Sequence, residues 1–387
     1  MQAIARNPST SLPALALLSQ QAIAYTMLGG GSMIFFALLC WLRSPQMLTT
    51  DFSRQFCQNL AQTALLFVAL LSYPHFIWSY RFAYQQGLAF TIKHFWRLVV
   101  VPLLLVAILA VSAVSWERPL TELPLPHQII EALSAGAIGN PTETGRALFG
   151  TLLTVQLVLS GQHFCLQTHG ITLALAQEKN YSLTDKQRRL LRWNFYLLWI
   201  VNVANGYAFL DQLSLGKSLI HVPLAGKLLL DFLLVASLAL VIKDIVIKKL
   251  NEEQRLPPAL SIVPIAALYC WLQPFLQPYG FQLWAVPIAH GAQFLYCAAR
   301  AEGNGFSKNT FGNSYIQVAV SAALCAGLGY LLFISLPVFF ASSLPLRAQH
   351  NFYFIAAYVF FSLHHYNVDG VIWKHGSRAR ATLTPLA

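Results

Sequence analysis

Charged residues are scarce in this sequence. They make up 10% of its 387 residues, whereas hydrophobic residues make up 56%. A soluble domain carries a charge on roughly a quarter of its residues, so this composition excludes an ordinary soluble protein. Acidic residues are the rarer kind, with 14 Asp and Glu against 25 Lys and Arg. The net charge of +11 does not indicate a nucleic-acid-binding protein, because the basic residues lie in short segments between apolar runs.

Several signatures of known chemistry are also missing. The sequence has no P-loop, no H-E-x-x-H, no G-x-S-x-G and no G-x-G-x-x-G motif. Their absence disfavours nucleotide-driven transport, zincin proteolysis, serine hydrolysis and Rossmann-type cofactor binding. The six cysteines are scattered and include no C-x-x-C pair. They indicate packing residues rather than a disulfide framework or a zinc knuckle.

The sequence consists instead of long apolar runs, each long enough as a helix to cross a hydrocarbon core of about 30 Å. These runs predict an all-α fold, a polytopic transmembrane bundle of about ten helices. The bundle forms one integral membrane domain over residues 1–387. The predicted helices cover residues 21–42, 57–79, 97–115, 147–176, 191–210, 221–242, 261–278, 281–299, 315–341 and 351–370.

The distribution of basic residues predicts the orientation of this bundle. Alternate connecting segments, together with the amino end, hold eighteen of the 25 basic residues, and the segments on the other side hold six. Cytoplasmic loops carry the excess of Lys and Arg in membrane proteins, so the richer side is predicted to be cytoplasmic. Both termini then lie in the cytoplasm, and the expected location is the bacterial inner membrane.

Histidines recur in four of the predicted helices, where a polar side chain is costly to insert. The motifs are SYPHFIWSYRFAY at 72–84, GQHFCLQTHG at 161–170, PIAHGAQFLY at 287–296 and SLHHYNVDGVIWK at 362–374. Three of them place a histidine about 9 to 15 Å before a basic residue on the cytoplasmic side, and His163 lies somewhat deeper. We therefore expect imidazoles from four helices to meet at one buried metal site. The candidate ligands are His75, His163, His290, His364 and His365.

These histidines also have a plainer interpretation. A single histidine in a membrane is often a hydrogen-bonding packing residue, and His75 and His365 lie close enough to the interface to be wetted. Successive residues on a helix point about 100° apart, so His364 and His365 cannot easily bind one ion together. The spacing slightly favours His364 and leaves His365 open.

Other polar residues of the same motifs are candidates for supporting roles. Gln167, Gln293 and Tyr366 are expected to hydrogen-bond the ligands and fix their tautomers. Asp369 and Tyr296 are the candidate catalytic groups, Asp369 because it follows the histidine pair and Tyr296 because its spacing of three places it on the face of Gln293.

The four motifs resemble those of a group of uncharacterised bacterial polytopic membrane proteins. Some of these proteins are described as similar to the Brp/Blh carotene-cleaving dioxygenases, helical membrane enzymes in which histidines hold a non-haem iron that activates oxygen. By this resemblance His75, His163, His290 and His364 are the expected iron ligands. The H-x-x-x-H and H-x-x-H-H boxes of integral desaturases are missing.

The leading expectation is a membrane-embedded metalloenzyme, a non-haem iron oxygenase. Its substrate would be lipophilic, an isoprenoid, carotenoid or acyl chain that enters from the bilayer. The expected cofactor is Fe²⁺, with zinc as the alternative. Three other functions remain open: a transporter or channel that uses the histidines with Lys227 and Asp231, a zinc-dependent membrane hydrolase that uses Asp369, and a haem-binding electron carrier.

Overall fold

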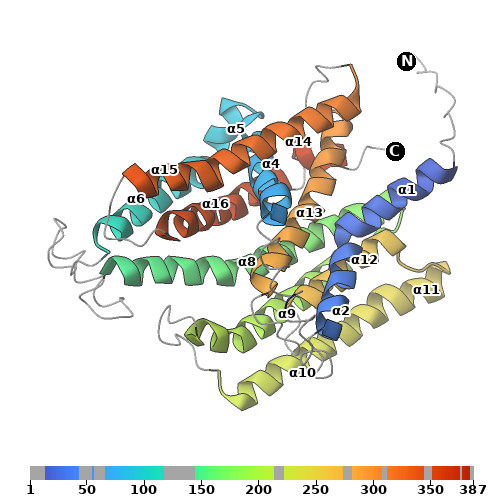
Figure 1. Cartoon of the computed structure of the whole chain (residues 1–387). Coiled ribbons are helices and arrows are strands. Elements are labelled where there is room, and N and C mark those ends of the chain that lie inside the picture. Colours follow the sequence, from blue (N-terminus) through green and yellow to red (C-terminus); the bar gives the residue numbers. More distant parts are fainter. Residues whose placement is uncertain are drawn as a thin grey trace.

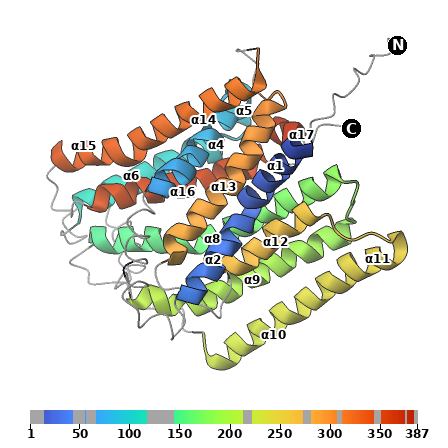
Figure 2. The ribbon, with the colours of Figure 1, turned by 45° about the vertical axis from the view of Figure 1, so that its right-hand side comes forward.

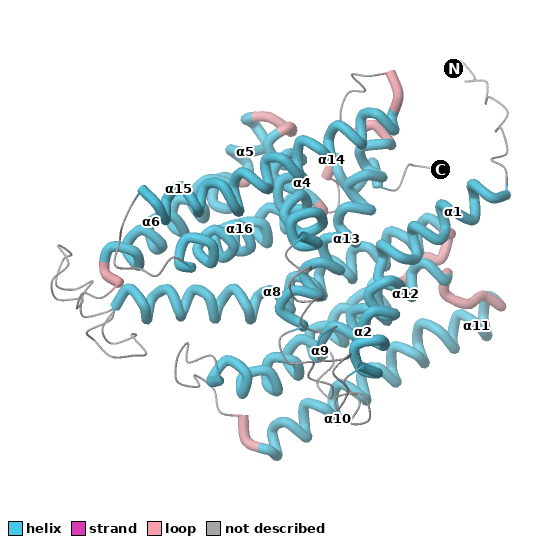
Figure 3. The backbone as a smooth tube through the Cα atoms, viewed as in Figure 1, coloured by secondary structure: helices cyan, strands magenta, loops and turns pink. Residues whose placement is uncertain are grey.

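The computed structural model describes residues 14–42, 55, 66–116, 144–212, 222–272, 281–306, 312–343, 351–374 and 377–383. Within these ranges the regular structure is helical and no strand occurs (Figure 1, Figure 3). The prediction of an all-α fold is therefore confirmed for the described part of the chain. Part of the predicted helix at 57–79 and of that at 261–278 lies outside it.

The first half of the bundle contains α1 (Ala14–Tyr25), α2 (Gly31–Leu42), α4 (Tyr73–Tyr84), α5 (Leu88–Lys93), α6 (Val101–Val114), α8 (Thr144–Glu178) and α9 (Asp185–Gln212). The second half contains α10 (Leu224–Val241), α11 (Lys248–Glu253), α12 (Ala259–Leu272), α13 (Phe281–Gly303), α14 (Ser314–Tyr330), α15 (Leu336–Ser343), α16 (Asn351–Ile372) and α17 (Arg378–Leu383). Short π-helical turns adjoin several of them: η1 (Thr26–Gly30), η2 (Val68–Ser72), η3 (Trp96–Val100), η5 (Ile242–Ile247) and η6 (Leu331–Ser335).

Four helical segments among the described residues are long and apolar enough to cross a membrane: Gln20–Leu38, Trp96–Val114, Thr144–Glu178 and Ser314–Ser343. Their outer faces carry large apolar side chains that the described part of the chain leaves exposed. Leu103 on α6 is 64% exposed and Leu324 on α14 is 61% exposed. Apolar surface of this extent is costly in water and suits contact with lipid, so the structure is compatible with a membrane protein.

The four helices that carry the histidine motifs meet near the centre of the bundle. Helix α16 packs against both α4 and α8, and α13 packs against α4 and the η2 turn that precedes it. In Figure 2, α13 crosses in front of α8 while α4 and α16 lie together above it. Segments that are distant in the sequence therefore surround one interior region.

Glycine at position 291 permits the close packing of α13 on η2. A Cβ atom placed on this residue would lie 2.6 Å from the carbonyl oxygen of Leu71, closer than non-bonded atoms tolerate. The two backbones can therefore touch only where a side chain is missing. The ring of the neighbouring His290 lies edge-on to that of His75 on α4, with a centroid distance of 5.3 Å.

A buried ion pair holds the other end of the same helices together. Both oxygens of the Glu302 carboxylate on α13 accept hydrogen bonds from Arg81 on α4, at 2.8 and 3.1 Å. One oxygen also accepts from Gln317 and Ser321 on α14. A buried charge is tolerated when it is paired and fully hydrogen-bonded, and this network fixes α4, α13 and α14 relative to one another.

Candidate metal centre

Histidines from all four motif helices converge in the interior of the bundle. His75 lies on α4, His163 on α8, His290 on α13 and His365 on α16. All four side chains are buried, with exposed fractions between 0% and 6%. Four buried imidazoles in contact with one another are costly to assemble in an apolar interior, so their convergence points to a function rather than to packing alone.

The ring nitrogens approach one another at the spacing of neighbouring metal ligands. The Nε2 atoms of His75 and His365 are 3.2 Å apart, and those of His163 and His290 are 3.1 Å apart. Two nitrogens bound at about 2.0–2.1 Å to one tetrahedral ion would lie roughly 3.3 Å from each other. The observed separations are close to this value, so the rings need to move little to bind an ion.

The carboxylate of Asp369 lies at the edge of this cluster. Its Oδ2 atom is 3.4 Å from Nε2 of His365 and 3.7 Å from Nε2 of His163, distances that exceed an ordinary hydrogen bond. Oδ2 is buried and has no hydrogen-bond partner in the described part of the chain. A buried carboxylate oxygen left without a partner is unfavourable, and a bound cation would satisfy it.

The donor atoms form two groups of three that could each hold a metal ion. One group is His75, His290 and His365, and the other is His163, His365 and Asp369. In each group the ligand atoms lie within 4.8 Å of one another, and His365 belongs to both. The second group, two imidazoles and one carboxylate, is the donor set typical of non-haem iron(II) oxygenases.

Aromatic rings set the orientation of these histidines. The ring of Tyr366 stacks on His163 with a centroid distance of 4.4 Å, and its hydroxyl pairs with Ser160 Oγ at 2.6 Å. Phe164 packs on His290 at 4.6 Å, and Phe76 lies edge-on to His365 at 4.9 Å. The Nδ1 atoms of His290 and His365 have no hydrogen-bond partner among the described residues. Packing contacts therefore fix the orientation of these two rings, a role that a hydrogen bond from Nδ1 usually plays.

The first histidine of the adjacent pair, His364, lies outside the cluster. His364, which the resemblance placed in the ligand set, belongs to neither donor group and stacks on Tyr80 with a centroid distance of 5.1 Å. The spacing favoured His364, but the structure places His365 in the cluster. The two side chains are both buried, so burial alone does not separate their roles.

The remaining sequence-predicted residues lie beside the cluster or away from it. Gln293 donates to the carbonyl of Leu28 at 2.7 Å, and Gln167 donates to the carbonyl of His290 at 3.3 Å. Neither amide is bonded to an imidazole ring within the ranges that the structure describes. Tyr296 lines a small separate cavity with Glu178 and Arg300, so its side chain does not border the histidines.

Sequence reasoning missed Ser79, whose hydroxyl donates to Oδ1 of Asp369 at 2.9 Å. The spacing of residues in the sequence nevertheless indicated this contact. Ser79 follows His75 by four residues on α4, and Asp369 follows His365 by four residues on α16, so each pair shares a helical face. Two such faces that meet in the bundle bring the hydroxyl to the carboxylate.

We expect Ser79→Ala to weaken metal binding by about 10- to 100-fold, the usual effect of removing a group that orients a ligand. Without the hydroxyl, the Asp369 carboxylate loses the bond that fixes its rotation. The measurement is a competition titration of the purified protein with a chelator of known affinity. A variant that binds the ion as tightly as the wild type would show that the Ser79 hydroxyl does not position the carboxylate.

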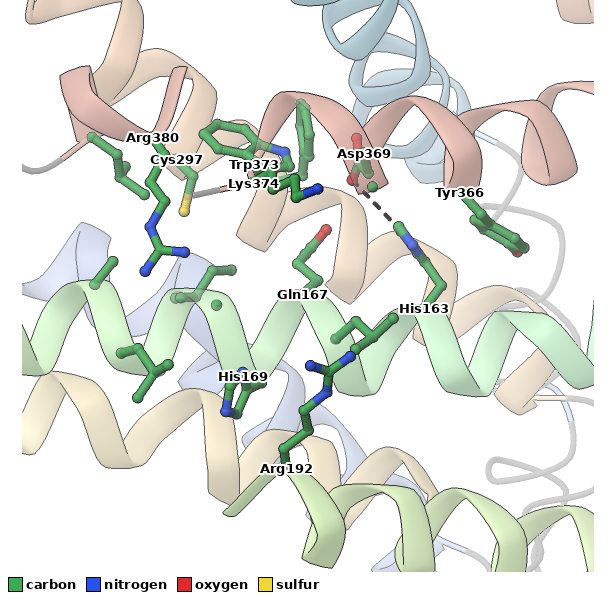
Figure 4. A pocket seen from close by; sticks show the side chains of 18 residues that line it. His163, Gln167, His169, Arg192, Cys297, Tyr366, Asp369, Trp373, Lys374 and Arg380 are labelled. Atoms are coloured by element: carbon green, nitrogen blue, oxygen red, sulfur yellow. Dashed lines mark ion pairs between the residues drawn. The ribbon is translucent and has the colours of Figure 1, made fainter. Parts of the chain in front are cut away.

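A cavity of about 380 Å³ opens from one side of the cluster (Figure 4). His163, Tyr366 and Asp369 border its inner end, whereas His75, His290 and His365 do not line it. The cavity thus reaches the cluster on the side of His163 and Asp369, whereas His75, His290 and His365 are buried, with exposed fractions of 0% to 2%. A bound ion would have its accessible face toward the cavity, which has the size of a small-molecule site.

The polar pair predicted on α10 lies apart from this centre. Lys227 and Asp231 are four residues apart on the helix, but no ion pair joins them in the part of the chain that the structure describes. Asp231 Oδ1 is buried without a hydrogen-bond partner in the same ranges. The ion pair that a spacing of four residues permits is therefore not formed among the described residues.

No protein-family model, curated protein or solved structure matches this chain. The chemistry of the site itself is therefore what bears on function.

Proposed function

We propose that the protein is a membrane-embedded metalloenzyme that holds one Fe²⁺ ion between α4, α8, α13 and α16. The ligands are drawn from His75, His163, His290, His365 and Asp369. The observation that carries this proposal is the group His163, His365 and Asp369, a set of two imidazoles and one carboxylate of which two members border the cavity. Such a set favours iron(II) and leaves coordination positions open toward a substrate.

The proposed reaction is a dioxygenation of a lipophilic substrate, an isoprenoid or an unsaturated acyl chain. Both atoms of O₂ enter the substrate: the carbon–carbon double bond breaks and two carbon–oxygen double bonds form. The four electrons that reduce O₂ come from the two carbons, so no external reductant is needed. The protein's part is to orient the chain along the cavity, exclude water from the buried cluster and hold the iron ligands in place.

The setting that we propose is the bacterial inner membrane. All ten predicted helices would cross the bilayer, with both termini on the cytoplasmic side, in agreement with the distribution of basic residues. The substrate would enter from the lipid, because the outer faces of the bundle are apolar.

Metal analysis tests this proposal. We expect the protein, purified in a nonionic detergent and loaded with Fe²⁺ without oxygen, to hold about one iron per chain and to show no Soret band. His163→Ala and His290→Ala should each lose the iron and still insert into the membrane.

Incubation with ¹⁸O₂ and an unsaturated substrate should place one labelled oxygen in each of two carbonyl products. A protein that binds no metal, or variants that keep full iron content, would overturn the proposal.

The group of three histidines favours a second function, a zinc-dependent hydrolase. His75, His290 and His365 supply three neutral imidazoles, the ligand set of several catalytic zinc sites. Asp369 could then act as the general base toward a zinc-bound water. Selective retention of zinc over iron, together with hydrolysis that does not depend on O₂, would support this function in place of the first.

A further inference from the structure

The cavity beside the metal centre changes character along its length. Asp369 borders its inner end, and Asp369 is the one acidic residue among the described residues that line it. Apolar side chains make up much of its lining: Leu166, Ile171, Leu173, Ala174, Phe294 and Leu383. Three cationic side chains also line it, Arg192, Lys374 and Arg380, and Arg380 lies away from His163 and Asp369 (Figure 4). The cavity thus combines an apolar lining with three positive charges.

The two arginines come from different helices and reach the cavity from opposite walls. Arg192 rises from α9 on one side of α8, and Arg380 descends from α17 on the other (Figure 4). The charges of Arg188, Arg192 and Arg380 all act on His169, which lies between them on α8. Arg192 and Arg380 therefore both lie near His169.

No carboxylate compensates these charges in the described part of the chain. Arg192 donates to the hydroxyl of Tyr196 at 2.9 and 3.1 Å, a neutral partner that leaves its charge in place. The side chains of Arg380 and Lys374 have no ion pair within the same ranges. Partial burial, and then the neighbouring Arg188, lower the pKa of Arg380. An anion between the guanidinium groups would relieve this repulsion and accept several charge-assisted hydrogen bonds.

We propose that the cavity binds a single-chain amphiphile with an anionic head group. The head group lies between Arg192, Arg380 and Lys374, and the apolar chain runs past Phe294 toward His163 and Asp369. This inference deepens the proposed function and rests on it for the role of the inner end. A volume of about 380 Å³ suits one chain and is too small for a two-chain lipid.

The positions of the charges also set where a bound chain would meet the metal centre. Along α8, His169 lies six residues beyond His163, which is about 9 Å of helix. A head group held near His169 therefore places a carbon several bonds along the chain next to the metal centre. The substrate class is then an acidic lipid whose reactive double bond is internal rather than beside the head group.

Binding of oleate in a nonionic detergent tests this inference, with oleyl alcohol as the neutral counterpart. We expect oleate to bind at least tenfold more tightly than oleyl alcohol. The double variant Arg192→Gln, Arg380→Gln should weaken oleate binding by about tenfold or more and leave oleyl alcohol unaffected. The control is Lys186→Gln, Arg189→Gln, which removes two exposed cations from α9 that do not line the cavity.

Two further experiments extend this test. The first distinguishes an anionic head group on a chain from a free anion, and the second separates the substrate inference from the proposed metal centre. Dodecyl phosphate should compete with oleate, whereas inorganic phosphate alone should not, because it lacks the chain. His75→Ala, which removes a ligand outside the cavity, should lose the metal and still bind oleate. Iron retention with equal binding of oleate and oleyl alcohol would overturn the anionic-substrate inference alone. Oleate binding by a wild-type protein that takes up no metal would overturn the metal centre alone.

Discussion

His365→Ala is expected to abolish metal retention, reducing the bound metal from about one ion per chain to below roughly a tenth. His365 belongs to both donor groups, so its loss leaves each group with two ligands. Its Nε2 atom lies 3.2 Å from His75 and 3.4 Å from the Asp369 carboxylate. Elemental analysis of the purified variant after loading gives the measurement.

The adjacent histidine supplies a matched control for this experiment. His364→Ala removes a side chain of the same size, with a 4% exposed fraction against 0% for His365, so the packing cost of the two substitutions is similar. We expect His364→Ala to keep its metal, because the ring stacks on Tyr80 outside the cluster. The opposite result, metal lost with alanine at 364 and kept with alanine at 365, would contradict the assignment of ligands from the structure.

Asp369→Asn is expected to weaken metal binding by about a hundredfold to several thousandfold. The amide has nearly the shape of the carboxylate and can still accept the hydrogen bond from Ser79, so the substitution removes charge and little else. A divalent ion among neutral imidazoles in a buried site would then lack its nearest negative charge. Removing one partner of a buried charge pair costs about 3–5 kcal/mol, which corresponds to this change in affinity.

A chelator competition titration measures this change, and Asp231→Asn is its control. Asp231 is also an acidic residue of an apolar helix, but it lies on α10 and outside both donor groups. We expect the affinity of this control to equal that of the wild type. Unchanged affinity in the Asp369→Asn protein would mean that the carboxylate does not contact the ion and that only the histidines hold it.

Much of the helical architecture follows from the sequence because membrane insertion imposes a simple rule. Apolar runs of sufficient length form helices, and the predicted ranges 97–115, 147–176 and 315–341 overlap described helices long and apolar enough to span a membrane. The motifs also identified the histidines that meet in the interior, because an imidazole is costly to insert in an apolar helix and is therefore usually functional. The number of spanning helices and the cytoplasmic position of the termini remain predictions.

The parts that the sequence did not reveal depend on helix rotation and packing. The choice between His364 and His365 is decided by how α16 turns against α4, and adjacent residues differ by about 100°. The π-helical turn η2 and the contact at Gly291 set the register of α4 against α13, and neither has a clear sequence signature. The cations that line the cavity come from α9, the bend after α16 and α17, which only the tertiary fold brings together.

The order of the ligands along the chain has a consequence for biogenesis. His75 lies in the first quarter of the sequence, and His365 and Asp369 lie within its last 23 residues. Both donor groups contain His365, so neither can form while the ribosome is still translating the segment before α16. Under the proposed function, the ion would therefore bind only after α16 has been synthesised, and the helices before α16 would insert and associate without help from the ion.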